Sequence, residues 1–126
     1  MITKNNFKDW LRQAEADLES VKYNLQGKKY YVCANYSQQA VEKALKSLLL
    51  KKGILNKTHN ITNMAKTLKL PEELISKISE LEPVHQESVY PDVSPKIPAE
   101  NYDEEDASNF FNIAKEVLEW IKKTIK

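Results

Sequence analysis

Cysteine, glycine and arginine are nearly absent from this 126-residue chain, which contains Cys33, Gly27, Gly53 and Arg12 as their only representatives. A lone cysteine cannot form an intramolecular disulfide, and it also excludes a cysteine-rich zinc site. Neither glycine has another glycine nearby, so the chain has no glycine-rich loop of the kind that cradles phosphate groups. Two histidines without a neighbouring cysteine make no recognisable metal-binding set.

Long apolar runs and net charge are also missing. No stretch approaches the roughly 18 apolar residues that a membrane span requires, and the N-terminal residues lack the apolar core of a secretory signal. Nineteen basic and 18 acidic residues leave a net charge of +1, so no overall field attracts nucleic acid or membranes. We expect a cytoplasmic protein that forms one domain over residues 1–126 and does not associate with membranes.

Helical periodicity dominates the rest of the sequence. Apolar residues recur at intervals of three and four near the N-terminus, with Trp10 beside them, at Phe7, Leu11, Ala14, Leu18, Val21 and Leu25. This pattern predicts a helix of about 20 residues. We expect Asn6 to cap its start and Gly27 to adopt the left-handed conformation after its end.

The pattern continues through the remaining helices. A second helix is predicted from about Tyr30 to Lys52, ending at Gly53; its stripe comprises Ala34, Ser37, Val41, Ala44, Leu45 and Leu48. Thr58 is expected to cap a short helix, and Pro71 is expected in the first turn of the next one. Residues 83–102 hold four of the five prolines and show no helical period, which predicts a loop.

The last predicted helix is strongly amphipathic. Its apolar face comprises Ala107, Phe110, Phe111, Ala114, Val117, Leu118, Ile121 and Ile125. Acidic residues 103–106 precede it and Lys122, Lys123 and Lys126 close it, so both ends complement the helix dipole. Since no strand-like alternation competes, the sequence predicts an all-α fold, an antiparallel four- to five-helix up-and-down bundle.

A polar stripe crosses the second helix. Asn35, Gln39, Glu42 and Lys46 fall on one face, at i, i+4, i+7 and i+11. This stripe is either a solvated face with a Glu42–Lys46 pair or part of a polar interface or ligand groove. Gln38 falls inside the apolar stripe, where its amide needs partners from a neighbouring helix or across a dimer seam.

Two further segments allow two interpretations each. His59 either opens a short helix and bonds locally, or uses the near-neutral titration of histidine for proton transfer or phosphate contact. The run Tyr90-Pro91-Asp92 is either a simple turn or an aromatic and a carboxylate that stack a base and bond a ribose. Ser37 has no base at a convincing spacing.

Several short motifs follow one another over nearly the whole chain. They are "DWLRQAEADLESVKYNL", "GKKYYVCANYSQQAVEKALKSLLLKKG", "THNI" and "VYPD", followed by the acidic lead-in to the last helix. In this combination the chain resembles a HEPN domain. The resemblance implies a helical bundle, commonly a homodimer, often encoded beside a minimal nucleotidyltransferase. It also implies a role in toxin–antitoxin or defence systems, in nucleotide binding or, in some branches, in metal-independent RNA cleavage.

The ribonuclease branches carry an arginine followed four to six residues later by a histidine, and this sequence lacks that pair. Arg12 has no histidine near it. Lys52 and His59 have a similar separation, but they lie after the second helix and the first of them is a lysine. Val89 stands where related proteins often have arginine. Lysine also lacks the planar fork with which arginine grips phosphate. We therefore expect no catalytic residue, no cofactor and no metal.

The favoured hypothesis is a non-catalytic HEPN protein that binds a nucleotide or RNA, or a partner nucleotidyltransferase. Its lysines would meet phosphate and its tyrosine would stack on or cap the ligand. The expected binding residues are Gln39, Glu42, Lys43, Lys46, His59, Tyr90 and Asp92. The alternatives are a divergent ribonuclease toxin that uses His59 or His85, and a purely structural dimerisation module.

Overall fold

The computed structural model describes residues 6–56 and 58–125 and is all-α over these ranges, as predicted. Its elements are α1 (Phe7–Gln26), α2 (Tyr30–Lys51), α3 (Ile61–Thr67), α4 (Glu72–Leu81), α5 (Val84–Glu87), the 3₁₀ turn η1 (Pro98–Glu100) and α6 (Glu104–Ile125). Within the described ranges no helix is both long and apolar enough to span a membrane. Lys126, expected at the end of the last helix, lies outside the described residues.

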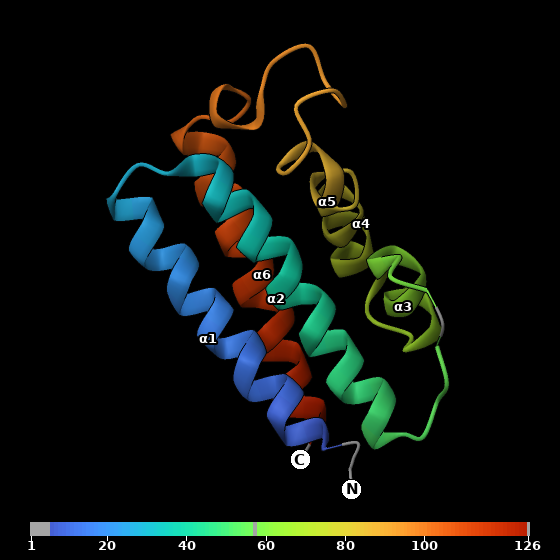
Figure 1. The fold of residues 1–126 in the computed structure, drawn as a ribbon. Helices are drawn as coiled ribbons and strands as arrows, with labels where there is room; N and C mark the ends of the chain where they lie inside the picture. The colour runs from blue at the N-terminus through green and yellow to red at the C-terminus, as the bar shows by residue number, and fades with distance from the viewer. Residues whose placement is uncertain (1–5, 57, 126) are drawn as a thin grey trace, which may run out of the picture.

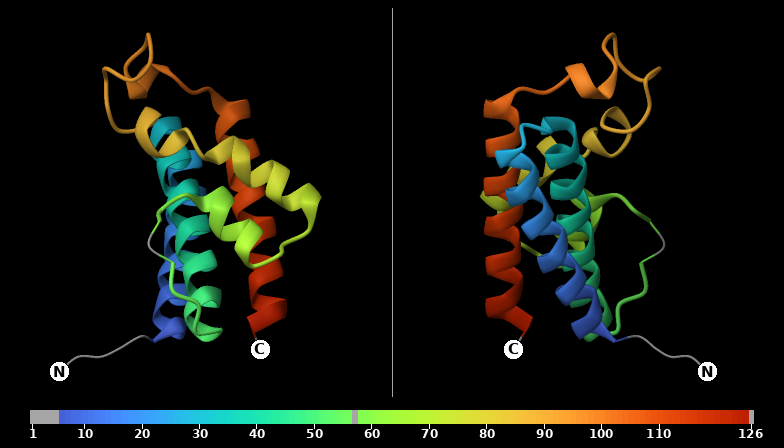
Figure 2. Two further views of the ribbon diagram at one scale, coloured as in Figure 1. Left: turned by 90° about the vertical axis from the view of Figure 1, so that its right-hand side faces the viewer. Right: turned by 60° about the vertical axis from the view of Figure 1, so that its left-hand side comes forward.

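The three long helices lie along one another, as Figures 1 and 2 show. α1 and α2 run in opposite directions, α3 to α5 together lead the chain back along the bundle, and α6 then runs parallel to α2 (Figure 1). This order of directions confirms the predicted up-and-down bundle. The start of α1 and the end of α6 consequently lie at the same end of the molecule (Figure 2).

Helix α2 is the centre of the bundle because it packs against both α1 and α6. Eleven of its 22 residues are buried, several of them small, which lets the neighbouring helices approach closely. The largest buried apolar side chains are Leu45, Leu48, Leu49, Ile61, Met64, Ile78, Leu81, Leu118 and Ile121. Burial of such side chains is the main stabilising contribution to a domain of this size.

The end of α1 differs from the prediction made for Gly27. That glycine has φ −83°, and the left-handed residue is Lys28, with φ 61°. Lys29 N–H then donates to the carbonyl of Asn24 at 2.9 Å, so the hydrogen bonds that close the helix place the left-handed position one residue later. Gly53, with φ 70°, does take the left-handed conformation after α2.

Two other local predictions were wrong. Asn60, not Thr58, caps α3: its Oδ1 accepts from the N–H of Asn63 at 2.7 Å, while the Thr58 hydroxyl oxygen accepts from the N–H of Asn60. The segment 83–102 is not all loop, because it contains α5 and η1. A single helical turn is too short to show a periodic stripe, but the buried side chain of Val84 anchors it to the core.

Gln38 is fully buried, as its place in the apolar stripe indicated, but the prediction of a hydrogen-bonded amide was wrong. Neither its amide nitrogen nor its oxygen has a hydrogen-bond partner in the part of the chain that the structure describes. Since the side chain is 0% exposed in the single chain, a dimer seam cannot supply the missing partner either. A buried amide without hydrogen-bond partners costs on the order of 1–3 kcal/mol of stability.

Candidate functional site

A hollow of about 440 Å³ lies between α1, α2, the loop before α3, α5 and the segment just after α5. We call it the polar hollow; it is lined by Trp10, Asn35, Gln39, Glu42, Lys43, His59, His85, Val89 and Tyr90. Five of the seven expected binding residues are in this set. Lys46 and Asp92 are not among the lining residues, and Asp92 is exposed on the turn that follows Tyr90.

A chain of hydrogen bonds crosses α2 beside the polar hollow. Lys43 Nζ lies 2.6 Å from Oδ2 of Asp17 on α1 and 3.4 Å from Oε1 of Gln39. The Gln39 amide donates to Asn35, whose own amide donates to the hydroxyl of Ser88 at 3.0 Å. These bonds tie α1, α2 and the residue after α5 together, so Asn35 and Gln39 of the predicted polar stripe belong to a connected structural network.

The two lysines expected to meet phosphate already have partners. Lys43 forms an ion pair with Asp17, whose side chain is only 4% exposed. Lys46 lies over the indole of Trp10, with Nζ 5.3 Å from the ring centroid, a favourable cation–π arrangement. An anion in the polar hollow would therefore meet Lys43 as a fixed, partly neutralised cation.

His59 and Glu42 join the loop before α3 to α2. Nδ1 of His59 lies 2.6 Å from Oε2 of Glu42, and the carboxylate is 16% exposed while the imidazole is 75% exposed. This contact, between residues 17 apart in sequence, corrects two expectations: His59 does not bond only locally, and Glu42 does not pair with Lys46. A carboxylate at Nδ1 orients the ring and favours a proton on that nitrogen, which leaves Nε2 for a ligand.

His85 and Tyr90 come from α5 and the segment just after it. Tyr90 N–H donates to the carbonyl of Gln86 at 3.0 Å, which holds the tyrosine beside the end of the helix. Both side chains are exposed, and Pro91 and Asp92 form the turn that the sequence suggested. The second histidine of the chain thus lies in the same hollow as the first.

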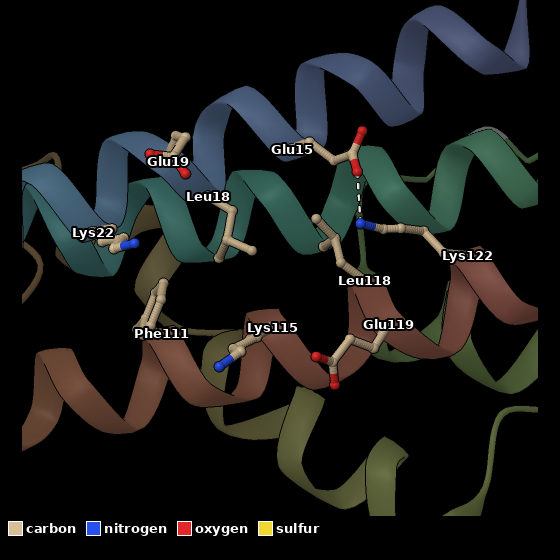
Figure 3. Close-up of a pocket in the computed structure, with 9 residues that line it drawn as sticks. All are labelled: Glu15, Leu18, Glu19, Lys22, Phe111, Lys115, Leu118, Glu119 and Lys122. Atoms are coloured by element: carbon tan, nitrogen blue, oxygen red, sulfur yellow. Dashed lines mark ion pairs between the residues drawn. The ribbon is translucent and has the colours of Figure 1, made fainter.

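A second hollow, of about 410 Å³, lies between α1 and α6 (Figure 3). Its charged residues are Glu15, Glu19, Lys22, Lys115, Glu119 and Lys122. Three acids and three bases cancel in formal charge, and Glu15 and Lys122 form an exposed ion pair at 2.7 Å. This hollow therefore offers no preference for an ion of either sign, whereas the polar hollow gathers both histidines of the chain and five of the seven expected binding residues, which makes it the better candidate for a ligand site.

Comparison with known proteins identifies the family to which this chain belongs. The model of the HEPN domain family matches residues 7–124. The chain is a member of the HEPN family. MJ1304 of Methanocaldococcus jannaschii, whose name proposes that it is a toxin, is 32% identical over 131 residues, covering 93% of this chain and 86% of that protein.

Solved structures agree with this HEPN assignment. ST0689, an archaeal HEPN homologue, superposes with a TM-score of 0.87 at 36% identity, covering 98% of this chain and all of that one. TT1696 from Thermus thermophilus superposes with a TM-score of 0.88 at 28% identity, covering 95% of this chain and 98% of that one. A HEPN domain protein from Thermotoga maritima, at 23% identity, 92% and 96% coverage and a TM-score of 0.76, shares the fold.

Four residues that line this hollow of the HEPN chain were not in the expected binding set: Trp10, Asn35, His85 and Val89. Asn35 lies on the predicted polar stripe but was not in the expected binding set, and His85 was considered only for a nuclease. Trp10 was taken as a neighbour of the apolar stripe of α1, yet it is 36% exposed. Its position just off that stripe was the available signal, because a tryptophan there lies at the seam with the next helix.

The single thiol of the HEPN chain is not part of the site. Cys33 is buried, its Sγ–H donates to the carbonyl of Val21 at 3.5 Å, and burial raises the pKa of the thiol. Because the reactive form of cysteine is the thiolate, this environment makes Cys33 a poor nucleophile.

Proposed function

We propose that this HEPN protein binds a ribonucleotide, free or within an RNA strand, in the polar hollow, and that it acts in a toxin–antitoxin-type system. The observation that carries the proposal is the convergence of polar side chains from four separate segments on a hollow of about 440 Å³, a size typical of small-ligand sites. The name of the Methanocaldococcus relative supports the setting.

The charges around the polar hollow favour a phosphate only with help from the histidines. Glu42 and Lys43 cancel in formal charge among the residues that line the hollow, and Lys43 is already paired with Asp17. Histidine is the side chain that changes charge near neutral pH, and its ring nitrogens donate well to phosphate oxygens. The histidines therefore meet the phosphate, and Tyr90 covers the ligand from the edge of the hollow.

The position of the single arginine supports binding rather than cleavage. Arg12 is on the exposed side of α1, 3.4 Å from the carboxylate of Asp9, and does not line the polar hollow. No guanidinium is therefore available there to stabilise the charge that develops on phosphate during cleavage. We accordingly propose that the protein is non-catalytic.

Replacing His85 by asparagine is expected to raise the Kd for 5′-AMP by about tenfold or more, because one charge-assisted hydrogen bond to phosphate is lost. His85 is exposed, so the fold is expected to persist. Isothermal titration calorimetry measures the effect, with Lys115→Gln in the α1–α6 hollow (Figure 3) as the matched control. Unchanged affinity in His85→Asn, or an equal loss in the control, contradicts the proposed site.

Ribonuclease activity is the second candidate, favoured by one observation: His59 and His85 line the same hollow. One histidine would take the proton of an RNA 2′-hydroxyl as its oxygen attacks phosphorus. The other would give a proton to the departing 5′-oxygen, leaving a 2′,3′-cyclic phosphate. Single-stranded RNA incubated with excess protein and EDTA is expected to stay intact. Cleavage that disappears in both His59→Ala and His85→Ala would replace the binding role with a nuclease.

The proposal also includes a protein partner. We propose that a homodimer of this HEPN protein binds a minimal nucleotidyltransferase in the cytoplasm. The segment after α5 supports a contact surface, because Val89, Tyr90, Val93 and Ile97 are 44–53% exposed within nine residues. Apolar side chains gathered in this way are typical of interaction sites. Native mass spectrometry of the protein from its host tests this: a heteromer supports the partner, whereas a bare homodimer favours a purely structural role.

A further inference from the structure

Trp10 lies at the junction of two hollows. It lines the polar hollow and also a smaller one of about 290 Å³, which is bordered by Asp9, Gln13 and Lys43. Trp10 and Lys43 belong to both linings, so the two hollows adjoin at these side chains. A ligand that contacts the histidines can therefore extend past the indole toward the exposed face of α1.

The indole of Trp10 has the properties of a stacking surface. It is 36% exposed, and because the ammonium of Lys46 lies over one face of the ring, 5.3 Å from its centroid, a base would stack on the opposite face. Any nucleobase can stack on such a ring, because every base has a flat aromatic face. Asp9 and Gln13 border the same small hollow, but the Asp9 carboxylate pairs with Arg12 and the Gln13 amide donates to Asp17, so the indole is the group there that can hold a base.

We propose that Trp10 is the base-binding residue of this protein. The base of a ribonucleotide stacks on the indole, over the small hollow that Asp9 and Gln13 border, while the phosphate lies by His59 and His85. The ligand is a free nucleotide or one unpaired residue of an RNA strand, since a duplex keeps its base faces covered. The inference rests on the proposed function and specifies which part of the ligand confers affinity.

Two ligands that share ribose and phosphate test the base subsite. Calorimetry of 5′-AMP and ribose 5-phosphate is carried out on the full chain and on Trp10→Leu, with Trp120→Phe on α6 as the control. The Kd for 5′-AMP is expected to rise about tenfold in Trp10→Leu, which is typical for one lost base–aromatic stack. The Kd for ribose 5-phosphate is expected to stay the same, and Trp120→Phe is expected to bind both as the full chain does.

Three further readouts separate the possible outcomes. Trp10→Phe keeps an aromatic ring and is expected to restore most of the affinity, and the fluorescence of Trp10 in the Trp120→Phe protein is expected to be quenched by 5′-AMP. A short single-stranded oligoribonucleotide distinguishes the two ligand sources, and the Trp10→Leu loss is expected for either. Equal 5′-AMP affinity in Trp10→Leu, or an equal loss for both small ligands, overturns the stacking role. If the unmodified protein binds neither the two small ligands nor the oligoribonucleotide, the proposed function itself fails.

Discussion

Replacing Asp17 by alanine is expected to lower the free energy of unfolding by about 3 kcal/mol, because it leaves a largely buried lysine without its partner. The Asp17 carboxylate accepts from Gln13 at 3.0 Å and from Lys43 at 2.6 Å. Its side chain is 4% exposed and that of Lys43 is 25% exposed, so water can replace the lost carboxylate only in part. Urea denaturation of both proteins measures the difference.

An exposed ion pair provides the matched control for Asp17→Ala. Glu15 and Lys122 also bridge two helices, at 2.7 Å, but both side chains are more than 40% exposed; Figure 3 shows the pair at the edge of the α1–α6 hollow. Glu15→Ala is expected to cost less than about 1 kcal/mol. Equal losses in the two variants would mean that burial adds nothing to the Asp17–Lys43 pair.

A double variant tests whether the loss of stability comes from an unpaired charge or from changed packing. Asp17→Leu combined with Lys43→Met removes both charges, and it is expected to recover most of the stability that either single change loses. Recovery would show that the single variants suffer from an unpaired charge. Additive losses would instead point to packing, and would remove the ion pair from the explanation of how α1 is held on α2.

Gln38→Met is expected to act in the opposite direction and to raise the free energy of unfolding by about 1–3 kcal/mol. Gln38 is fully buried and neither end of its amide is hydrogen-bonded within the described residues. Methionine has a similar unbranched shape and no strong hydrogen-bonding group, so the change removes a desolvated amide with little repacking. Thermal and urea unfolding, measured together, give the size of the effect.

The neighbouring glutamine is the control for this prediction. Gln39 bonds to Asn35 and Lys43, so Gln39→Met is expected to destabilise the protein while Gln38→Met stabilises it. A loss of stability in Gln38→Met would contradict the account, because it would show that the buried amide is satisfied in solution. Two adjacent glutamines with opposite effects would establish that the pair has two separate structural environments.

The sequence predicted the long helices because each shows several turns of one apolar stripe. It did not predict α5, since Val84 to Glu87 form a single turn, or the place of the left-handed residue at Lys28, which depends on hydrogen bonds at the helix end. Local patterns thus determine where a helix extends, while its boundaries depend on contacts that periodicity does not record.

The composition of the polar hollow was only partly predictable for a related reason. Gln39, Glu42 and Lys43 were found because they share one helix, where spacing fixes their relative positions. The partners of two of them come from elsewhere: Asp17 is 26 residues from Lys43, and His59 is 17 residues from Glu42. Pairings at such separations depend on the tertiary fold. Because of the contact with Asp17, Lys43 is a paired cation and not the free phosphate-binding cation that the sequence predicted.

The most direct test of the account uses the histidines, because the chain contains only His59 and His85 and both line the polar hollow. The full chain, labelled at the histidine rings, is titrated with 5′-AMP while the ring resonances are followed by NMR. Binding in the hollow predicts that the signals of both rings shift along one saturable curve that matches the calorimetric Kd. Binding that leaves both sets of ring signals unmoved would contradict the account and place the ligand elsewhere.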